Sequence, residues 1–405
     1  MAIDFQQIYE RIKEIGLSAE ERQKDLDEKR AQARILFNEY ADNLDGLRKK
    51  VDTALLQDAN IRCAYPLDEN LDTRVRTPDL ALDATLIAAD GSQIVPDRHA
   101  AVQFGLVNVG AIAMQLNSGK TPDIYTDSQL FFGDELITEY GATLSEGMIA
   151  LRRDLAERTK LAELAEDCLA SEDCSSPVIT FTDGPIELWE EKDPSSNYEK
   201  SLSEYLKALS RLQKNNIITA GYVDKPGANL VVRLLEIIQA PKEKLDKKEL
   251  PKYHPLLGIT DRWLYGEKEN PLLKSGERSA VFAIQTKSKK DYAGLLELHF
   301  FYLNVGKEGH PYPVRVEIPK WVADDRKKTD MLHAALIQQS RILGGRPFPY
   351  LLNRSHEIAV VSMKEKQYIE QIISKEIQKH GGEVDFESNK QIGKNSLSGR
   401  RRYKK

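Results

Sequence analysis

The stretch Leu-Ile-Ala-Ala-Asp-Gly-Ser at residues 86–92 has a counterpart in Val-Ile-Thr-Phe-Thr-Asp-Gly-Pro at residues 178–185. In both stretches an apolar run of the kind found in buried strands leads directly into an Asp-Gly pair. We predict that Asp90 and Asp183 lie where two strands end, at the sheet edge where open α/β sheets bind ligands. Gly at the next position lets the backbone turn sharply or approach a ligand closely.

Each Asp-Gly pair, taken alone, is also a common hairpin dipeptide and could mark a turn and nothing more. Its occurrence after two buried-type runs favours the strand-end interpretation. If the two strands are neighbours, Asp90 and Asp183 can share a divalent cation. Phosphodiester hydrolysis uses such a site, because Mg²⁺ and Mn²⁺ take oxygen ligands and leave positions open for water and phosphate.

From about residue 75 onward, short apolar runs alternate with amphipathic segments, which predicts an α/β sheet flanked by helices. The predicted strands are 85–89, 101–112, 178–182, 217–223, 281–285, 296–305, 314–318 and 358–362. The predicted helices are 143–170, 198–215, 229–238, 330–343 and 364–379.

The two ends of the chain differ from this body. Apolar side chains at helical spacing, beginning with Phe5, Tyr9 and Ile12, predict an N-terminal helical arm over residues 1–70, made of two helices or one bent helix. A body of residues 75–380 and a basic tail of residues 388–405 follow. The tail is rich in Ser, Asn and Gly, so we predict that it is disordered and is either a solvated terminus or a phosphate-binding arm.

Composition limits the classes of function. A net charge of −5 and a pI near 5.9 argue against coating nucleic acid by bulk electrostatics, but not against a local basic groove. No apolar run approaches the roughly 20 residues that span a bilayer, and the N-terminus lacks a signal-peptide pattern. The three cysteines form no metal-ligand pattern. We therefore expect a cytoplasmic protein with reduced thiols.

Four segments occur in a characteristic order: the two Asp-Gly strands, Gly-Tyr-Val-Asp-Lys at 221–225, and Arg-Pro-Phe-Pro-Tyr-Leu-Leu-Asn-Arg-Ser-His at 346–356. Over roughly residues 75–380 the chain resembles the NurA family of DNA-end-resection nucleases. The resemblance implies a ribonuclease-H-like mixed sheet and Mn²⁺-dependent (or Mg²⁺-dependent) DNA cleavage, including 5′-to-3′ exonuclease action. It also implies a homodimer that works with a HerA-type hexameric ATPase in the recombination repair of double-strand breaks.

The resemblance further implies a Glu on the helix that precedes the second Asp strand. Glu157, after the Arg152-Arg153 pair, matches best, and Glu146 is the alternative. Leucines nearby place Glu157 close to the buried face of that helix, although a solvated carboxylate is the competing interpretation. Lys225, predicted to follow a strand end, would bind the scissile phosphate, or would be an ordinary surface lysine.

His356 matches a family histidine that would bind Mn²⁺ or move a proton, whereas a lone His beside a strand is often structural. His99, close after Asp90, is a rival. Arg315 and Glu317 share one face of a predicted strand, where they would pair with each other or line a DNA channel. Asp261 is either an additional ligand or a helix N-cap.

The sequence contains no Gly-x-x-x-x-Gly-Lys-Ser/Thr loop, so translocation by that route requires a motor in trans. Two alternatives stay open. One is a DNA-binding adaptor of a motor ATPase that keeps the fold without turnover. The other is a different ribonuclease-H-like enzyme, such as an RNA-guided or junction nuclease.

Overall fold

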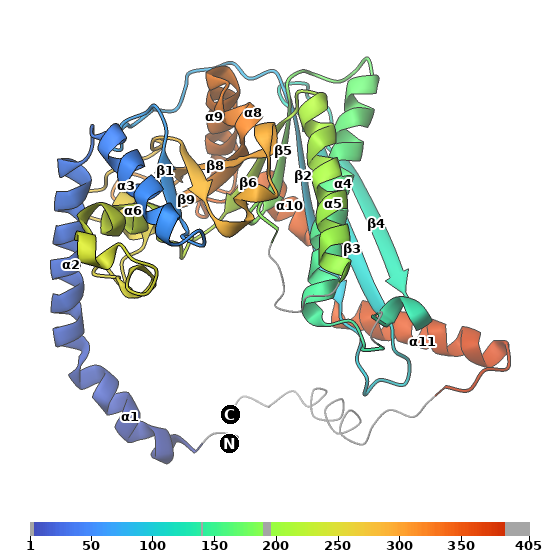
Figure 1. The fold of residues 1–405 in the computed structure, drawn as a ribbon. Helices are drawn as coiled ribbons and strands as arrows, with labels where there is room; N and C mark the ends of the chain where they lie inside the picture. The colour runs from blue at the N-terminus through green and yellow to red at the C-terminus, as the bar shows by residue number, and fades with distance from the viewer. Residues whose placement is uncertain (1–3, 139–140, 189–195, 385–405) are drawn as a thin grey trace. The chain divides into compact units, whose positions relative to one another are not determined.

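The computed structural model describes residues 4–138, 141–188 and 196–384 (Figure 1). The chain forms two compact units. Unit 1 contains residues 1–81, 184–186 and 220–348, and unit 2 contains residues 82–183, 187–219 and 349–405. The predicted basic tail, residues 388–405, lies outside the described residues.

The sheet of unit 2 has the strand order β5-β2-β3-β4. Strands β2 (Thr85–Ile94), β3 (Gly105–Gln115) and β4 (Asp123–Phe131) are antiparallel, and β5 (Val178–Asp183) runs parallel to β2. A parallel pair needs a long crossover connection, and helix α4 (Glu146–Ala170) lies between β4 and β5 in the chain. This order and direction confirm the ribonuclease-H-like mixed sheet.

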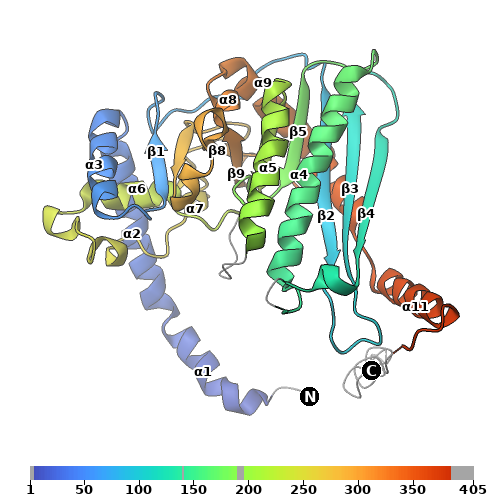
Figure 2. The ribbon, with the colours of Figure 1, turned by 45° about the vertical axis from the view of Figure 1, so that its right-hand side comes forward.

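Helices cover the sheet of unit 2. Helix α4 packs on β2 and β3, and α5 (Ser196–Lys214) packs beside α4, as Figures 1 and 2 both show. Helix α10 (Tyr350–Ala359) packs on β2 and β3, and α11 (Met363–Lys379) follows it. Ile369 and Ile373 of α11 pack against a buried apolar cluster of Ile94, Phe104 and Leu106, and Ile94 is the last residue of β2. A short 3-10 helix spans Gly133–Leu136.

Unit 1 has an antiparallel sheet with the order β1-β7-β8-β9-β6. Its strands are β1 (Cys63–Pro66), β6 (Ile218–Val223), β7 (Phe282–Gln285), β8 (Leu298–Asn304) and β9 (Pro313–Pro319). Every residue of β8 and β9 is buried, which requires cover on both faces of the sheet.

The helices of unit 1 differ in how far they are buried. They are α1 (Phe5–Leu17), α2 (Ala19–Glu39), α3 (Leu44–Gln57), α6 (Leu230–Gln239), α7 (Asp261–Tyr265), α8 (Lys320–Ala323) and α9 (Arg326–Ile342), with 3-10 turns at 242–244, 250–252, 287–290 and 294–296. The first eight residues of α6 are all buried, as expected of a helix that is mostly apolar around its circumference. Helices α2 and α3 each bury three residues, whereas α1 buries none.

Most predicted strands and helices are present. The N-terminal segment, predicted as two helices or one bent helix, contains the three helices α1, α2 and α3, and three further differences concern strands. Residues 358–362 form no strand, because Ile358 and Ala359 complete α10 and the Val360 N–H donates to the His356 carbonyl. Strands β1 and β4 were not predicted. Most of β4 is exposed and polar, and β1 has four residues ending in Pro, so neither presents a long apolar or alternating run.

The prediction of three reduced thiols is wrong for two cysteines. Cys168 and Cys174 form a disulfide near the end of α4, with Cα atoms 5.3 Å apart. Cys63 is free, and burial raises the pKa of its thiol to about 12. Among the described residues no helix has both the length and the apolar character needed to cross a membrane.

Candidate metal centre

Asp90 and Asp183 occupy neighbouring positions in unit 2. The parallel pairing of β2 and β5 runs from Thr85–Val178 to Ala89–Thr182, and the two aspartates are the next residues on their strands. Adjacent strands lie about 4.8 Å apart, and residues in register point to the same face of a sheet. The expectation that the two strands are neighbours is confirmed.

Asp183 lies at a strand end as predicted, but Asp90 does not. Strand β2 continues to Ile94 and pairs with β3 throughout, with Asp90 opposite Gly110. The reason is that β3 is longer than β5, so the antiparallel ladder extends past the point where β5 stops. Asp90 therefore lies at the end of the parallel pairing, within an unbroken strand.

The two Asp-Gly pairs use glycine for different purposes. Gly184 has φ = +92°, a backbone conformation that side chains rarely allow, and it turns the chain after Asp183. Gly91 instead allows close packing of α4 on β2. A Cβ at Gly91 would lie 2.5 Å from Cγ of Arg153 and 2.6 Å from Oε1 of Glu157. The turn interpretation is therefore wrong for Asp90-Gly91.

Glu157 is a buried carboxylate on α4, with 6% of its surface exposed. Its Oε1 lies 3.4 Å from Nε of Arg153, whose Nη2 is 2.8 Å from Asp154. Burial, together with the negative charges of Asp154 and Asp90, raises the pKa of Glu157 well above its usual range. Of the two glutamates considered, Glu157 approaches β2, whereas Glu146 is exposed at the first residue of α4.

His356 lies on α10, not beside a strand, and it contacts Asp90. Its Nδ1 is 2.6 Å from Oδ2 of Asp90. Because an ionised carboxylate only accepts hydrogen bonds, Nδ1 donates, and a neutral ring keeps the lone pair of Nε2 for a proton or a metal. The side chain of His356 is 64% exposed, while that of Asp90 is 14% exposed. A solvent-accessible imidazole is thus held by a largely buried carboxylate.

The arrangement bears on whether a metal ion fits. Successive residues of a strand point to opposite faces, so Asp90 faces α10 while Gly91 faces Glu157 on α4. In the described parts of the chain, no three His, Cys, Asp or Glu side chains are gathered closely enough to hold a metal ion, although Asp90 is close enough to Glu157 for its charge to raise the pKa of Glu157. The donor chemistry nevertheless suits an oxygen-ligated divalent cation, because the buried charge of Glu157 is destabilised by its acidic neighbours.

Lys225 belongs to unit 1, whereas Asp90, Glu157, Asp183 and His356 all belong to unit 2. It is exposed, lies two residues after the end of β6 and has φ = +44°, which is rare for a residue with a side chain. The expected position after a strand is confirmed. Its proposed contact with the scissile phosphate stays a prediction.

The remaining candidates have structural contacts. Arg315 and Glu317 are buried and pair with each other at 2.9 Å, and Glu317 also accepts the Ile186 N–H. Fully buried Asp261 caps the start of α6 by accepting the Val231 and Val232 N–H groups, each at 2.8 Å. It caps a helix other than the one it begins. His99 lies in the loop between β2 and β3, after the last residue of β2.

Arg158 was not predicted from the sequence, although it directly follows Glu157. It is 1% exposed, and its guanidinium donates to the hydroxyls of Thr182 (2.9 Å), Thr219 (3.2 Å) and Tyr205 (3.3 Å). Thr182 immediately precedes Asp183. An Arg at a buried helical position was the available signal, since an Arg there needs polar partners.

The strand order and strand directions of unit 2 are those of a ribonuclease-H-like protein. A family model described as the NurA domain matches residues 84–361, more than half of the sequence. The chain belongs to the NurA family.

Comparisons with solved structures gave matches of low sequence identity. The NurA nuclease from Sulfolobus solfataricus is 13% identical, with 92% of this chain and 98% of that chain covered and a TM-score of 0.46. The catalytic domain of human Endonuclease V is 13% identical, with 80% and 96% covered and a TM-score of 0.30. Drosophila Piwi is 12% identical, with 69% and 30% covered and a TM-score of 0.31. No curated protein matches the sequence.

Proposed function

We propose that this chain is a divalent-metal-dependent DNA nuclease that resects the ends of double-strand breaks, with 5′-to-3′ exonuclease and single-strand endonuclease activity. The register of unit 2 carries the proposal, because it brings Asp90 and Asp183 to neighbouring positions where β5 ends. The approach of buried Glu157 to the same strand, which Gly91 permits, gives further support. Membership of a nuclease family is consistent with both observations.

Asp90, Glu157 and Asp183 would hold Mn²⁺ or Mg²⁺, with His356 as a further ligand. When bound, the ion would polarise the scissile phosphodiester and lower the pKa of a water molecule. In the alternative role, without binding the ion, His356 would take up or return a proton through Nε2, since Asp90 occupies Nδ1. Lys225 would bind the phosphate and offset negative charge that develops on it.

Cleavage of a substrate panel tests this proposal. Single-stranded, duplex, branched and RNA–DNA hybrid substrates are incubated with Mn²⁺, Mg²⁺ or chelator, using the wild type, Asp90→Ala and Asp134→Ala. Asp134 is an exposed carboxylate of unit 2 that is not one of the proposed metal-binding residues, so Asp134→Ala controls for the loss of one negative charge. We expect cleavage with metal by the wild type and the control, and none by Asp90→Ala.

Three other outcomes would contradict the proposal. Cleavage by Asp90→Ala at the wild-type rate would remove this site from the chemistry. DNA binding without cleavage in either metal would favour the adaptor of a motor ATPase. Selective cleavage of branched or hybrid substrates would favour a different ribonuclease-H-like nuclease.

We also propose a HerA-type hexameric ATPase as partner, docked on α1, and a homodimer as the working form. Phe5, Tyr9, Ile12 and Ile15 are each more than half exposed, although they form an apolar stripe on α1. Such a stripe favours burial against another surface. Recovery of the ATPase is compared for the full chain and a chain lacking residues 1–17, and the mass of each is measured by light scattering. Equal recovery from both would rule out docking on α1, and loss of the dimer instead would assign the stripe to a second copy.

A further inference from the structure

Unit 1 contains a cavity of about 710 Å³ that the proposed cleavage site does not use. It lies beside the turn from β8 to β9 and the loop that follows α9. Its residues are Gly266, Lys268, Ser275, residues 305–307, residues 309–312, Ser340, Arg341, Gly344, Gly345 and Pro347. All of them belong to unit 1, so the cavity is complete within one unit.

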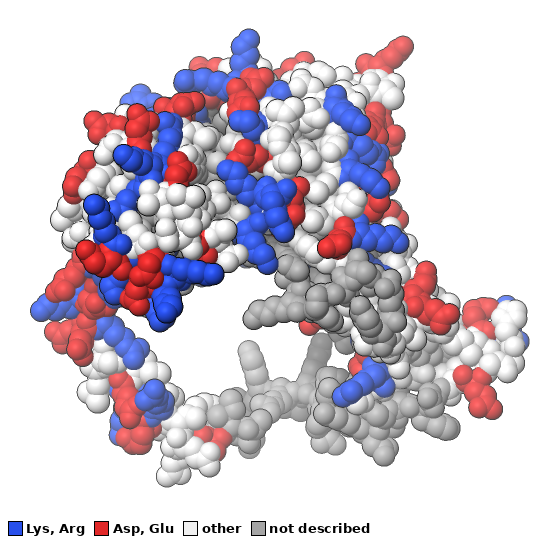
Figure 3. Space-filling model, viewed as in Figure 1, with Lys and Arg blue, Asp and Glu red and all other residues white. Residues whose placement is uncertain are grey.

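The charged groups around this cavity are all basic. Lys268, Lys307, His310 and Arg341 line it, and no Asp or Glu does. None of the four has an ion-pair partner among the residues that the structure describes. On the face in Figure 3, positive and negative side chains are mostly interspersed. A set of uncompensated cations around a hollow attracts an anionic ligand.

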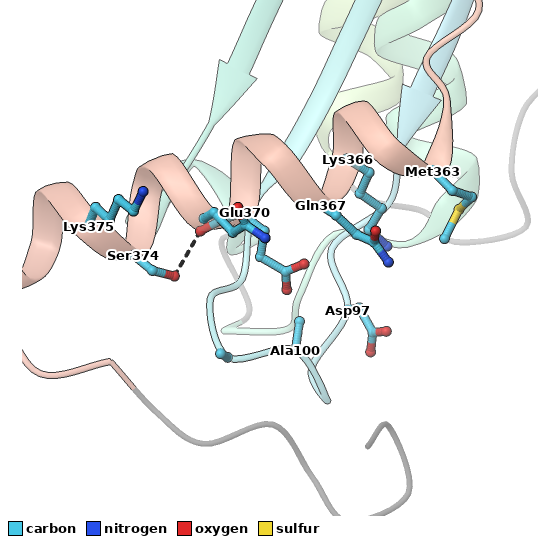
Figure 4. Close-up of a pocket in the computed structure, with 10 residues that line it drawn as sticks. Asp97, Ala100, Met363, Lys366, Gln367, Glu370, Ser374 and Lys375 are labelled. Atoms are coloured by element: carbon cyan, nitrogen blue, oxygen red, sulfur yellow. Dashed lines mark hydrogen bonds between the residues drawn. The ribbon is translucent and has the colours of Figure 1, made fainter. Parts of the chain in front are cut away.

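A second cavity in unit 2 shows the contrast. It lies between α11 and the loop at residues 97–101 and has a volume of about 550 Å³ (Figure 4). Lys366 and Lys375 line it together with Asp97 and Glu370, so its formal charges cancel. An anion gains little there, which leaves the cavity of unit 1 as the better candidate.

The interior of the unit 1 cavity is largely apolar. Val305 and Ser340 are buried, with 7% and 3% exposed, and Pro311, Tyr312 and Pro347 complete its walls. The Ser340 hydroxyl has no hydrogen-bond partner among the described residues. The ligand that suits these walls has a flat or apolar part beside its negative charge.

Two of the sequence motifs meet at this cavity. The Tyr312 hydroxyl donates to Asp224, 3.2 Å away, and Asp224 immediately precedes Lys225. The Tyr222 hydroxyl donates to the carbonyl of Pro347, 3.4 Å away, and the Tyr222 ring packs edge-on against Phe348. The segments 221–225 and 346–348 therefore support the cavity walls, which gives them a role that the carboxylates of unit 2 do not explain.

We infer that this cavity binds one nucleotide of single-stranded DNA, with phosphates at the three rim cations Lys268, Lys307 and Arg341 and the base against Tyr312 and the two prolines. A cationic groove combined with an aromatic or apolar platform is the general way in which proteins hold single strands. The inference rests on the proposed function, since a single strand is the product and substrate of end resection. The base would also give the Ser340 hydroxyl a polar partner.

The test measures how tightly the full chain binds a fluorescein-labelled oligothymidine. Binding is detected by fluorescence anisotropy, and a chelator is present to prevent cleavage. In Lys268→Gln/Lys307→Gln we expect affinity to fall on the order of tenfold near 0.1 M salt, and the log–log salt slope to fall by about 0.7 for each phosphate that the variant no longer neutralises. Lys247→Gln/Lys248→Gln is the matched control, because it removes two exposed lysines of unit 1 outside the cavity.

A second variant tests the cavity without changing charge. A Cβ at Gly345 would meet nothing within 4 Å, so Gly345→Trp is expected to fold and to fill the cavity. We expect it to weaken binding at least fivefold with an unchanged salt slope. Wild-type affinity in Gly345→Trp, or equal salt slopes in the two lysine double variants, would overturn the inference. A wild type that binds through this cavity but cleaves no DNA would instead overturn the proposed function alone.

Discussion

Replacing Gly91 by alanine tests how closely α4 approaches β2. The new Cβ would lie 2.5 Å from Cγ of Arg153 and 2.6 Å from Oε1 of Glu157, whereas real contacts are not shorter than 3.0 Å and ordinary contact begins at 3.4 Å. These atoms must therefore move by at least 0.4 Å, and by 0.8–0.9 Å to reach ordinary contact. Forcing atoms into a packed region typically costs about 1–3 kcal/mol of stability. A displacement near 1 Å in a catalytic group can lower a rate by about 100-fold, so we expect a loss of cleavage of that order.

The free energy of unfolding and the cleavage rate are measured for Gly91→Ala and for Gly105→Ala. Gly105 on the neighbouring strand β3 is the control, because a Cβ there meets its nearest atom at 3.4 Å. Both changes remove the same backbone freedom, so the difference between them isolates the collision with α4.

A double variant assigns the collision to its partner. Arg153→Ala removes Cγ and Cδ, both of which lie within 3.0 Å of the new Cβ. We expect the double variant to be more stable than the sum of the single changes predicts, by about 0.5–3 kcal/mol. If Gly91→Ala unfolds and cleaves as Gly105→Ala does, or if the two changes are additive, α4 does not approach β2 as described.

The remaining predictions each concern a single region. Asp183→Ala should abolish cleavage at saturating Mn²⁺ without lowering stability, since it removes one of several like charges; near-wild-type cleavage would remove Asp183 from the site. Deleting residues 396–405, which include Arg400, Arg401, Arg402, Lys404 and Lys405, should lower the salt slope of duplex binding by up to about 0.9 for each phosphate that the tail neutralises; an identical slope would show that the tail does not touch DNA. Burial lowers the pKa of His333 to about 4, so its contribution to stability is complete above pH 6.5 and is lost as pH falls toward 4, by on the order of 3 kcal/mol. His333→Gln should remove that part of the pH dependence in urea unfolding at pH 7 and 4.5, and an unchanged dependence would contradict the assignment.

The apolar runs of buried strands were sufficient to predict β2, β3, β5, β6, β7, β8 and β9. The same criterion failed for an exposed strand and for an apolar run that belongs to a buried helix. Strand β4 has little apolar surface to bury, and its pairing with β3 depends on the preceding hairpin. The run at 358–361 has the composition of a strand, but Ala359 packs on Gly110 of β3 as part of α10. A short apolar run cannot by itself distinguish these two outcomes.

The sequence indicated candidate residues, but not how the structure arranges them. The Asp-Gly pattern indicated Asp90 and Asp183, and the resemblance indicated Glu157 and His356. Nothing local to residue 91 distinguishes a glycine needed for a turn from one needed for close packing, because the packing partner lies on another helix. The same limit explains Arg158, whose three hydroxyl partners come from β5, β6 and α5.

Two consecutive residues of helix α4 contact the two strands that carry Asp90 and Asp183. Glu157 meets β2 at Gly91, and Arg158 binds the hydroxyl of Thr182, the residue before Asp183. Arg158 has no carboxylate within hydrogen-bonding distance among the described residues, so the hydroxyl groups of its three partners satisfy its buried guanidinium. Its positive charge also partly offsets the increase that burial and acidic neighbours cause in the pKa of Glu157. Because one helical turn makes both contacts, a shift of α4 would change the position of Glu157 relative to Asp90 and Asp183 at once. The register of β2 and β5 places the two aspartates beside each other, and the packing of α4 places Glu157 relative to them.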